Sequence, residues 1–449
     1  MNSVICRLAR LLCASVALTA GIAGDVSVTA VYPCDVGPGP KDAPDGVGAV
    51  GPNHIVGFTD ANVVILDKRS GKTVKKMSQT EFWKRVVKPG FDESRWNDPR
   101  MLYDPLCGRW FATHATDVGF LAVSDTSDPT KGWRGAHLPM EKTDPSIKMG
   151  VDRNGLYITY SVIRATTHTM GNLLAIPIAD AIAPGGPSLA NIQTFHDLEI
   201  DAFPATDLDP KKPADAPEVL LCHEFPINNA TYSKLYMYRV TWAGKTASIS
   251  PAQTISLSKT YYAPNASSSQ SQAAQPAPGQ KLRADEARRT TCAYAWNGSV
   301  FTCNGAKRTV GSRPGAFWCE VRAKDGELVQ EGLVDDRDSD FLIPTLAVDA
   351  TGDVGLGCTQ SSETLFPSVA VMVHAASDPK GAMRPPVLAA RGTTVFTSTR
   401  AGKYGIGWGN YNSTCVDPTD PTLFWTHQEY AADPAPDHYA TCWTAFKLR

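Results

Sequence analysis

The chain has 449 residues, of which 43% are hydrophobic and 20% are charged, and its net charge at pH 7 is −2. This composition is typical of a globular protein and excludes a disordered chain. The charge balance argues against a protein that binds nucleic acid or anionic membranes through bulk positive charge. Glycine and proline, 36 and 33 residues, supply many turns between short elements.

The first residues predict a secretory signal peptide over residues 1–23. Arg7 and Arg10 precede the apolar run 11–22, and Gly21 and Ala23 are the small residues before a cleavage after residue 23. The run is too short to cross the ~30 Å of a bilayer's hydrocarbon core, and no later stretch approaches the length of a transmembrane helix. We therefore expect a secreted protein, periplasmic or extracellular, with no transmembrane segment.

A repeated pattern follows the leader: an apolar residue, usually an Asp, a turn with Gly or Pro, and a new apolar run. Its copies lie near residues 51, 104, 152, 209, 297, 349 and 417, and each is followed by another short apolar strand. Asp caps the end of one strand, and Gly or Asn takes the positive φ that lets the next strand fold back. Steps of about 50–65 residues are typical of four-stranded propeller blades. Residues 24–449 are thus expected to form a single all-β domain, a seven-bladed β-propeller, with six blades as the alternative.

Two further segments complete this prediction. The alternating stretch 26–32 predicts an N-terminal strand that closes the ring beside residues 440–446, so that no sheet edge stays exposed. Residues 260–280 are rich in Ser, Gln, Ala and Pro, and predict a low-complexity surface loop.

Three blade sequences resemble those of secreted bacterial β-propeller proteins, most of them uncharacterised: DPRMLYDPLCGRWF, FLIPTLAVDATGDVGLG and GWGNYNSTCVDPTDPTLFWTHQEY. The resemblance covers nearly the whole chain after the leader. It implies fold and export, implies no chemistry, and is not a clear match to a characterised enzyme family. The last blade of that pattern usually has Trp-Gly-Asp-Tyr, where this chain has Trp408, Gly409, Asn410 and Tyr411. A metal-binding or proton-transfer role of that Asp therefore does not carry over.

The cysteines predict one disulfide. Nine cysteines follow the leader, an odd number, and none lies in a C-x-x-C pair. Asn297 and Gly298 predict a two-residue hairpin turn, which sets Cys292 opposite Cys303. We expect a Cys292–Cys303 disulfide, with Cys319 on the next strand as a rival partner of Cys303.

The sequence carries no motif of an established enzyme class. H-E-x-x-H, G-x-S-x-G, the P-loop and the dinucleotide fingerprint are absent, and the nearest approach to a sialidase Asp box, at residues 127–133, has the wrong spacing. Whether the protein is an enzyme is left open at this point, and no catalytic residue is assigned.

The candidate site is the propeller face formed by the loops entering the innermost strands and the loops joining the second and third strands. These loops surround the central channel. The expected binding residues are Trp96, Asp98, Arg100, Asp144, Lys148, His223, Glu224, Tyr404 and Trp408. Carboxylates beside cations and aromatic rings suit an oxygen-rich ligand such as a glycan.

Two function classes follow from this face. The missing motifs favour an exported, monomeric scaffold that binds a glycan or a protein partner, with no nucleic-acid partner. The alternative is a carbohydrate-active hydrolase or lyase that uses channel-face carboxylates and histidines.

No cofactor is expected, although one acidic turn has the ligand type that Ca²⁺ prefers. Asp336, Asp338 and Asp340 alternate along the chain. An EF-hand loop needs Gly at its sixth position and Glu at its twelfth, where this chain has Phe341 and Ala347. A solvated acidic turn is therefore favoured, with a Ca²⁺ site as the alternative.

Overall fold

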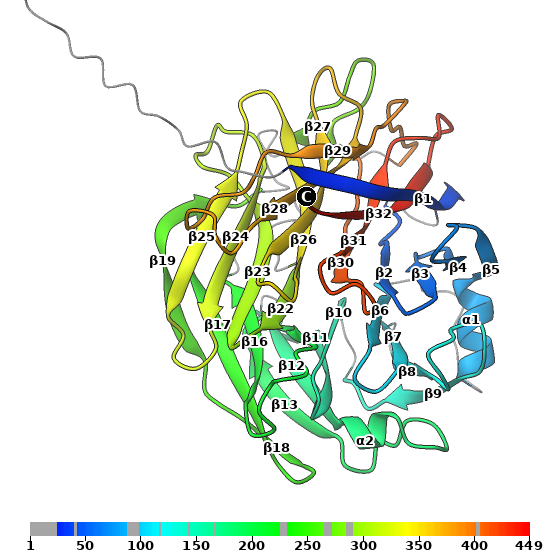
Figure 1. Cartoon of the computed structure of the whole chain (residues 1–449), viewed down its shortest axis with the longest axis vertical. Coiled ribbons are helices and arrows are strands. Elements are labelled where there is room, and N and C mark those ends of the chain that lie inside the picture. Colours follow the sequence, from blue (N-terminus) through cyan, green and yellow to red (C-terminus); the bar gives the residue numbers. More distant parts are fainter. Residues whose placement is uncertain are drawn as a thin grey trace, which may run out of the picture.

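The computed structural model describes residues 25–39, 43–87, 98–115, 118–141, 144–165, 168–224, 231–264, 272–283, 291–400 and 405–449. Over these residues the regular secondary structure is almost entirely β-strand, with two short helices, α1 (Gln79–Val86) and α2 (Ile178–Ala181). The sheets stand around a common centre, as the blades of a β-propeller do, which confirms the predicted all-β propeller class (Figure 1). Neither of the two helices has the length and apolar character needed to span a bilayer. The predicted signal peptide, residues 1–23, lies outside the described residues.

Four blades are four-stranded sheets. The first contains β2 (Val47–Val50), β3 (His54–Phe58), β4 (Asn62–Asp67) and β5 (Thr73–Ser78). The second contains β6 (Arg100–Asp104), β7 (Arg109–Ala115), β8 (Gly119–Ser124) and β9 (Trp133–Leu138). The third contains β26 (Asp340–Val348), β27 (Val354–Ser361), β28 (Ser368–His374) and β29 (Val387–Ala390). The fourth is ordered β1 (Val26–Pro38), β32 (His438–Leu448), β31 (Phe424–Tyr430) and β30 (Ser413–Val416).

The remaining strands form three more sheets. A five-stranded blade contains β14 (Phe203–Pro204), β16 (Glu218–His223), β17 (Thr231–Ala243), β18 (Thr246–Ile249) and β19 (Gln253–Tyr262). A nine-stranded sheet runs through β13 (Gln193–Leu198), β12 (His168–Pro177), β11 (Gly155–Ala165), β10 (Asp144–Val151), β15 (Thr206–Asp207), β22 (Cys292–Trp296), β23 (Ser299–Ala306), β24 (Gly315–Arg322) and β25 (Leu328–Val334). A small ribbon pairs β20 (Gln272–Ala273) with β21 (Leu282–Arg283).

The predicted number of blades, seven or alternatively six, is wrong. In the described part of the chain five blades have a sheet of their own, whereas β10–β13 and β22–β25 are joined in the nine-stranded sheet. The join is made by β15, because Thr206 pairs in parallel with Val151 on one side and with Tyr294 on the other. The sequence repeat marks where strands fall, but it carries no signal for inner strands of neighbouring units that come close enough to pair.

The predicted closure of the ring is confirmed. β1 runs antiparallel to β32 from the pair Val26↔Leu448 to the pair Pro38↔His438. Near its end Asp35 is buried, and its carboxylate accepts hydrogen bonds from Lys76 Nζ (2.7 Å) and the Tyr439 hydroxyl (2.7 Å). These contacts tie β1 to both the first and the last blade, and β1 covers the edge that β32 would otherwise expose.

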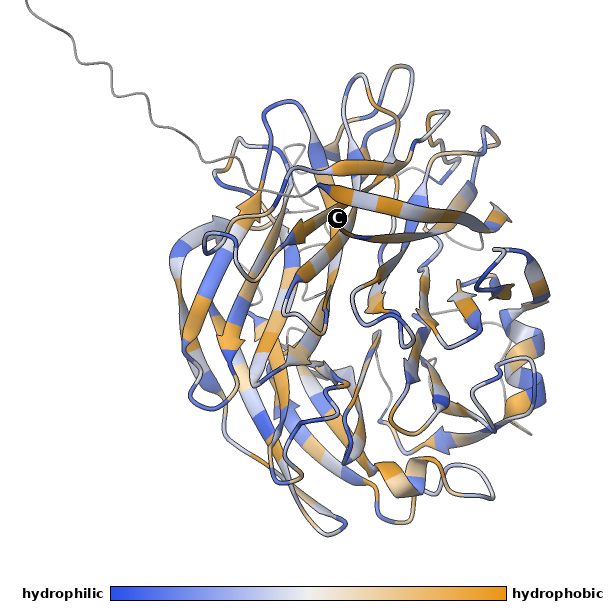
Figure 2. Ribbon diagram, viewed as in Figure 1, coloured by the Kyte–Doolittle hydropathy of each residue, from blue (hydrophilic) through white to orange (hydrophobic). Residues whose placement is uncertain are grey.

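The core lies between blades and not at one centre. Apolar residues are spread along the strands (Figure 2), and one buried cluster joins Trp318 of β24 to Leu356 of β27 and Phe446 of β32. Neighbouring sheets therefore stabilise each other face to face, and the inner strands are held rigidly around the centre.

The described end of the low-complexity segment is packed against the propeller. Ala273 and Ala274 are 0% and 1% exposed, and Ala273 belongs to a buried cluster with Phe396 and Trp408. Gln275 Nε2 donates to the Phe396 carbonyl, and Gln275 Oε1 accepts from the Phe396 N–H, both at 2.8 Å. A polar sequence can be buried when the backbone satisfies its amide groups, so composition alone does not describe these residues.

Candidate functional site

The inner strands enclose a central channel, a cavity of about 540 Å³. Its wall is drawn from β2, β6, β10, β14, β15, β22, β26 and β30 with their adjoining turns. Most of the wall is apolar, including Val47, Leu102, Met149, Phe203, Tyr294, Leu346 and Val348. Small-molecule sites typically have volumes of about 300–1,000 Å³ and mostly apolar linings with a few polar groups. The channel is therefore the strongest candidate for a binding site in the described structure.

The end of the channel where the inner strands begin carries a buried cation and its polar neighbours. Arg100 is the first residue of β6, and its guanidinium carbon lies 3.8 Å from the centroid of the Tyr411 ring. The Tyr411 hydroxyl donates to Asp98 Oδ2 at 2.8 Å. Arg100 is 7% exposed, its Nη1 donates to the Pro99 carbonyl (3.0 Å), and its Nε finds no hydrogen-bond partner among the described residues. A buried cation thus faces the channel, held flat on an aromatic ring.

The opposite end, formed by the turns that follow the inner strands, is mostly apolar, although Lys211 and Asp417 also line it. Leu106 lies beyond the end of β6 and is 41% exposed. It shares this part of the wall with Leu208, Trp296, Pro418 and Pro421. The channel therefore has a buried cation at one end and a mostly apolar opposite end, called the apolar end below, whose charged residues are one lysine and one aspartate.

Carboxylates are scarce in the described wall of the channel, where Asp417 is the one acidic residue. Lys68 Nζ and Trp425 Nε1 both donate to it at 2.9 Å. Burial opposes ionisation of Asp417, but the hydrogen bonds from Lys68 and Thr419 outweigh it and hold its pKa below the ordinary value. Glycoside hydrolysis generally needs two carboxyl groups facing each other across the substrate, and this wall offers no such pair.

Lys148 and His223, both predicted at the site, are buried in the structure. Lys148 Nζ lies 2.6 Å from Asp201 Oδ1 and donates to Ser146 Oγ at 3.0 Å. The His223 ring packs edge-on against Phe317, with 5.5 Å between centroids. Burial lowers the pKa of His223 to about 3, so the ring is neutral at pH 7. Neither side chain lines the channel.

The other predicted residues are also dispersed. Glu224 accepts a hydrogen bond from the Ser233 N–H (3.2 Å), and Trp408 is buried, with its Nε1 donating to Thr359 Oγ1 (3.0 Å). Asp144 begins β10 opposite Ser161. Trp96 and Tyr404 lie outside the described residues. Of the nine predicted residues, the described structure brings together Asp98 and Arg100, which meet at Tyr411.

Tyr411 was missed as a site residue, although it ends the Trp-Gly-Asn-Tyr motif of the last blade. The turn before it has positive φ at both Gly409 (71°) and Asn410 (55°), and the Gly409 N–H donates to Glu429 Oε2 at 2.6 Å. Asn and Asp tolerate this left-handed conformation better than other non-glycine residues. The position thus has a backbone reason to hold Asn or Asp, and the turn sets Tyr411 over Arg100.

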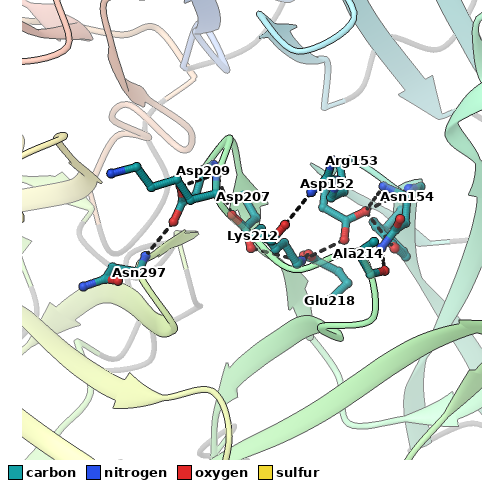
Figure 3. A network of polar contacts seen from close by, with 12 residues as sticks. Asp152, Arg153, Asn154, Asp207, Asp209, Lys212, Ala214, Glu218 and Asn297 are labelled. Atoms are coloured by element: carbon teal, nitrogen blue, oxygen red, sulfur yellow. Dashed lines mark hydrogen bonds and ion pairs between the residues drawn. The ribbon is translucent and has the colours of Figure 1, made fainter.

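A second polar network, also missed from the sequence, is centred on Lys212 (Figure 3). Lys212 Nζ lies 2.7 Å from Asp152 Oδ2, 3.0 Å from Asp207 Oδ2 and 3.1 Å from Glu218 Oε2. Burial raises the pKa of Glu218 well above its ordinary value, although Lys212 opposes this. The sequence marked Asp152 as a turn former, but a lysine in the following loop carries no such signal. Lys212 occupies the centre of the cluster, so the network stabilises the junction of two sheets.

The three aspartates of the acidic turn differ in their exposure to solvent. Asp336 and Asp338 are exposed, and the Asp338 N–H donates to Asp336 Oδ1 at 2.7 Å. Asp340 is buried and accepts hydrogen bonds from Arg313 Nη1 (3.0 Å) and the Ala274 N–H (2.8 Å). No group of three or more possible metal ligands is found in the described ranges. Calcium binding here stays a prediction, and it would require Asp340 to exchange its ion pair with Arg313.

The predicted register of the cysteine hairpin is confirmed. Cys292 pairs with Cys303 across β22 and β23, and their sulfurs lie 3.4 Å apart as two thiols. Cys319 pairs with Thr302 and packs in a different buried cluster, so the rival pairing has no support. A disulfide is not shown. Cys292 also lines the channel.

No family model matches the chain, and no curated protein matches it. Among solved structures, the β-propeller domain of the Trilobed protease from Pyrococcus furiosus is 11% identical, with 93% of this chain and 94% of that chain covered and a TM-score of 0.43. The endo-arabinase from Bacteroides thetaiotaomicron is 12% identical, with 66% and 94% covered and a TM-score of 0.32. The alpha-L-arabinanase from Penicillium chrysogenum, complexed with arabinobiose, is 9% identical, with 67% and 93% covered and a TM-score of 0.35. Likenesses this distant carry no argument about function, and the fold is assigned from the sheets themselves. The chain is a β-propeller protein without a clear match to a characterised family.

Proposed function

We propose that this protein is a binding protein whose central channel takes up a small, largely apolar ligand. The observation that carries the proposal is the channel itself, about 540 Å³ with a mostly apolar wall drawn from inner strands around the ring. Removal of apolar surface from water supplies about 25 cal/mol per Å². Because the inner strands are held rigidly by the sheets behind them, little ordering cost is added when the ligand binds.

Binding is better supported than hydrolysis. The wall contains Asp417 as its one described carboxylate, and that group is already engaged by Lys68 and Trp425. A glycan ligand is also less well supported, because each buried hydroxyl needs a hydrogen-bonding partner and most of the wall is apolar. A glycan therefore serves as a comparison ligand in the test.

The test is the titration of the purified protein with the neutral fluorescent probe N-phenyl-1-naphthylamine. We expect saturable binding of one probe per protein. Thr206→Phe places a large ring in the channel wall and should weaken binding by at least about tenfold, equivalent to about 1.4 kcal/mol. Thr246→Phe, on the exposed part of the outer strand β18, is the matched control and should leave binding unchanged.

Non-saturable binding, or equal binding by the two variants, would contradict the proposal. A panel of soluble oligosaccharides is titrated in parallel. Oligosaccharide binding that Thr206→Phe abolishes, with no probe binding, would favour the glycan-binding alternative.

We also propose that the protein is exported and that its hairpin thiols are oxidised after export. Support comes from the residues before position 24 and from the confirmed register of Cys292 and Cys303. The mature protein is expected to begin at Gly24, which N-terminal sequencing tests. Non-reducing peptide mapping is expected to recover Cys292 linked to Cys303, and an alkylating label on both cysteines of the unreduced protein would refute the disulfide.

A further inference from the structure

Two successive inner strands carry a basic residue at the same position. Arg100 in β6 and Lys148 in β10 each stand four residues before the Asp that begins the following turn, Asp104 and Asp152. Both side chains are buried, at 7% and 3% exposure. Lys148 has its counter-ion within the fold, since Nζ lies 2.6 Å from Asp201 Oδ1. The two positions therefore offer an internal comparison.

Arg100 has no corresponding counter-ion in the described structure. The nearby Asp98 carboxylate accepts a hydrogen bond from the Tyr411 hydroxyl, and no ion pair joins any described carboxylate to Arg100. Its described partners are one carbonyl oxygen, at 3.0 Å from Nη1, and the face of the Tyr411 ring. A buried guanidinium keeps its charge, and leaving a buried charge unpaired is costly. Such a group is an anion site if a ligand can reach it.

The channel provides that access. Arg100 and Tyr411 are part of its wall, at the end where the inner strands begin. From there the wall continues through Leu102 and Leu346 to Leu106 at the apolar end. The one described wall carboxylate, Asp417, lies at that apolar end and is paired with Lys68. An anion beside Arg100 therefore meets no opposing carboxylate from the described wall.

We propose that Arg100 is the counter-ion of the channel's ligand, and that this ligand is an amphipathic carboxylate with an aliphatic body. The inference rests on the proposed function and adds its ligand class. The guanidinium donates to the carboxylate oxygens with its planar set of N–H groups. Stacking on Tyr411 fixes the orientation of that plane, and the body of the ligand extends along the apolar wall.

The test compares ligands of one chain length and different charge. Decanoate, decanol and decyltrimethylammonium are titrated into the full-length mature protein by calorimetry. We expect decanoate to bind one per protein and at least about tenfold more tightly than decanol, because a charge-assisted hydrogen bond replaces a neutral one. The ammonium compound should not bind. Arg100→Met should reduce decanoate binding to the level of decanol.

Arg109→Gln is the matched control. Arg109 Nη1 also donates to the preceding backbone carbonyl, Gly108 O at 3.1 Å, but the residue is not part of the channel wall. This variant should bind decanoate as the unmodified protein does. If Arg100→Met does not fold, Arg100→Lys keeps the charge and removes the planar fork, and it should bind decanoate several-fold more weakly.

The outcomes separate this inference from the proposed function. Equal binding of decanoate and decanol, unaffected at Arg100 but weakened by Thr206→Phe, would overturn the inference and leave channel binding intact. Decanoate binding that Thr206→Phe does not weaken would place the acid elsewhere and also overturn the inference. Failure of both the acid and the neutral probe to bind would overturn both proposals.

Discussion

Lys212 shares its ammonium with three carboxylates from separate stretches of the chain: the turn after β10, the short strand β15 and the start of β16. Burial disfavours the charge on Lys212, but the three carboxylates outweigh it and raise the pKa of the amine. Removal of the cation would leave several acidic groups buried together. The residue is therefore expected to matter for stability and not for ligand affinity.

Lys212→Met tests this expectation. The variant should lose about 3–5 kcal/mol of unfolding free energy, because uncompensated carboxylates remain in the interior. Urea denaturation at pH 7 measures the loss. Lys211→Met is the control, since Lys211 is the exposed neighbour, and it should change stability by less than about 0.5 kcal/mol. Equal stability of the two variants would refute the role of the cluster.

His223 makes stability depend on pH. Its ring is neutral in both states above pH 6.5, whereas between pH 6.5 and about 3 the unfolded chain binds a proton that the folded chain does not. The neutral His223 ring therefore contributes its full share of the unfolding free energy above pH 6.5. That share is lost as the pH falls, at up to about 1.4 kcal/mol per pH unit. Between pH 6.5 and 4 the unfolding free energy of His223→Phe should fall less steeply with pH, because unfolding of this variant takes up one proton fewer. An unchanged slope in His223→Phe would contradict the assignment.

At the scale of elements, the hairpin of β22 and β23 shows what the sequence predicts well. Asn297 and Gly298 both have positive φ, and the turn fixes the whole register down to Cys292 and Cys303. Short-range turn chemistry determines such pairs. The parallel pairing of β15 with two inner strands depends on residues far apart in the chain, and no local pattern signals it.

In the candidate site, too, the sequence predicts local features but not contacts between residues far apart in the chain. Arg100 and Asp98 could be named because they lie in a loop entering an inner strand. Their partner Tyr411 comes from the last blade, 313 residues from Asp98, and its role depends on how the blades meet. Lys148 and His223 were predicted as site residues from their chemical type alone. Residue type does not reveal that Lys148 forms an ion pair within the fold or that His223 packs against an aromatic ring.

Substitution of Gln275 tests the packing of the described residues 272–283, which lie between β19 of the five-stranded blade and β22 of the nine-stranded sheet. Gln275→Ala removes both side-chain partners of the Phe396 backbone groups. Buried backbone groups left unpaired should cost about 1–3 kcal/mol, measured as a lower melting temperature and a lower urea midpoint. Gln272→Ala, three residues earlier in β20, is the control. An unchanged melting temperature in Gln275→Ala would show that these hydrogen bonds are replaced by water.

At the scale of the whole molecule, the ring depends on how β1 is anchored between the first and last blades. Asp35→Ala removes the acceptor that Lys76, Tyr439 and Thr59 share. Because hydrogen bonds to a charged group are worth about 1.5–3 kcal/mol each, we expect a loss of at least about 3 kcal/mol in urea unfolding. Asp336→Ala, at an exposed turn, should be nearly neutral. A loss confined to below about 0.5 kcal/mol would mean that the strand is held by its backbone pairing alone.

The pairing of β1 with β32 also sets an order of events when the chain is made. Synthesis proceeds from the N-terminus, so Val26 has been made long before its partner Leu448 exists. The blade of β6–β9 uses consecutive strands and can assemble as soon as they emerge, whereas the first strand must wait for nearly the whole chain. During that interval β1 has an open edge, the kind of surface that pairs with other chains. Until β32 has been made, that edge has no partner, so the pairing that holds β1 forms only late in synthesis.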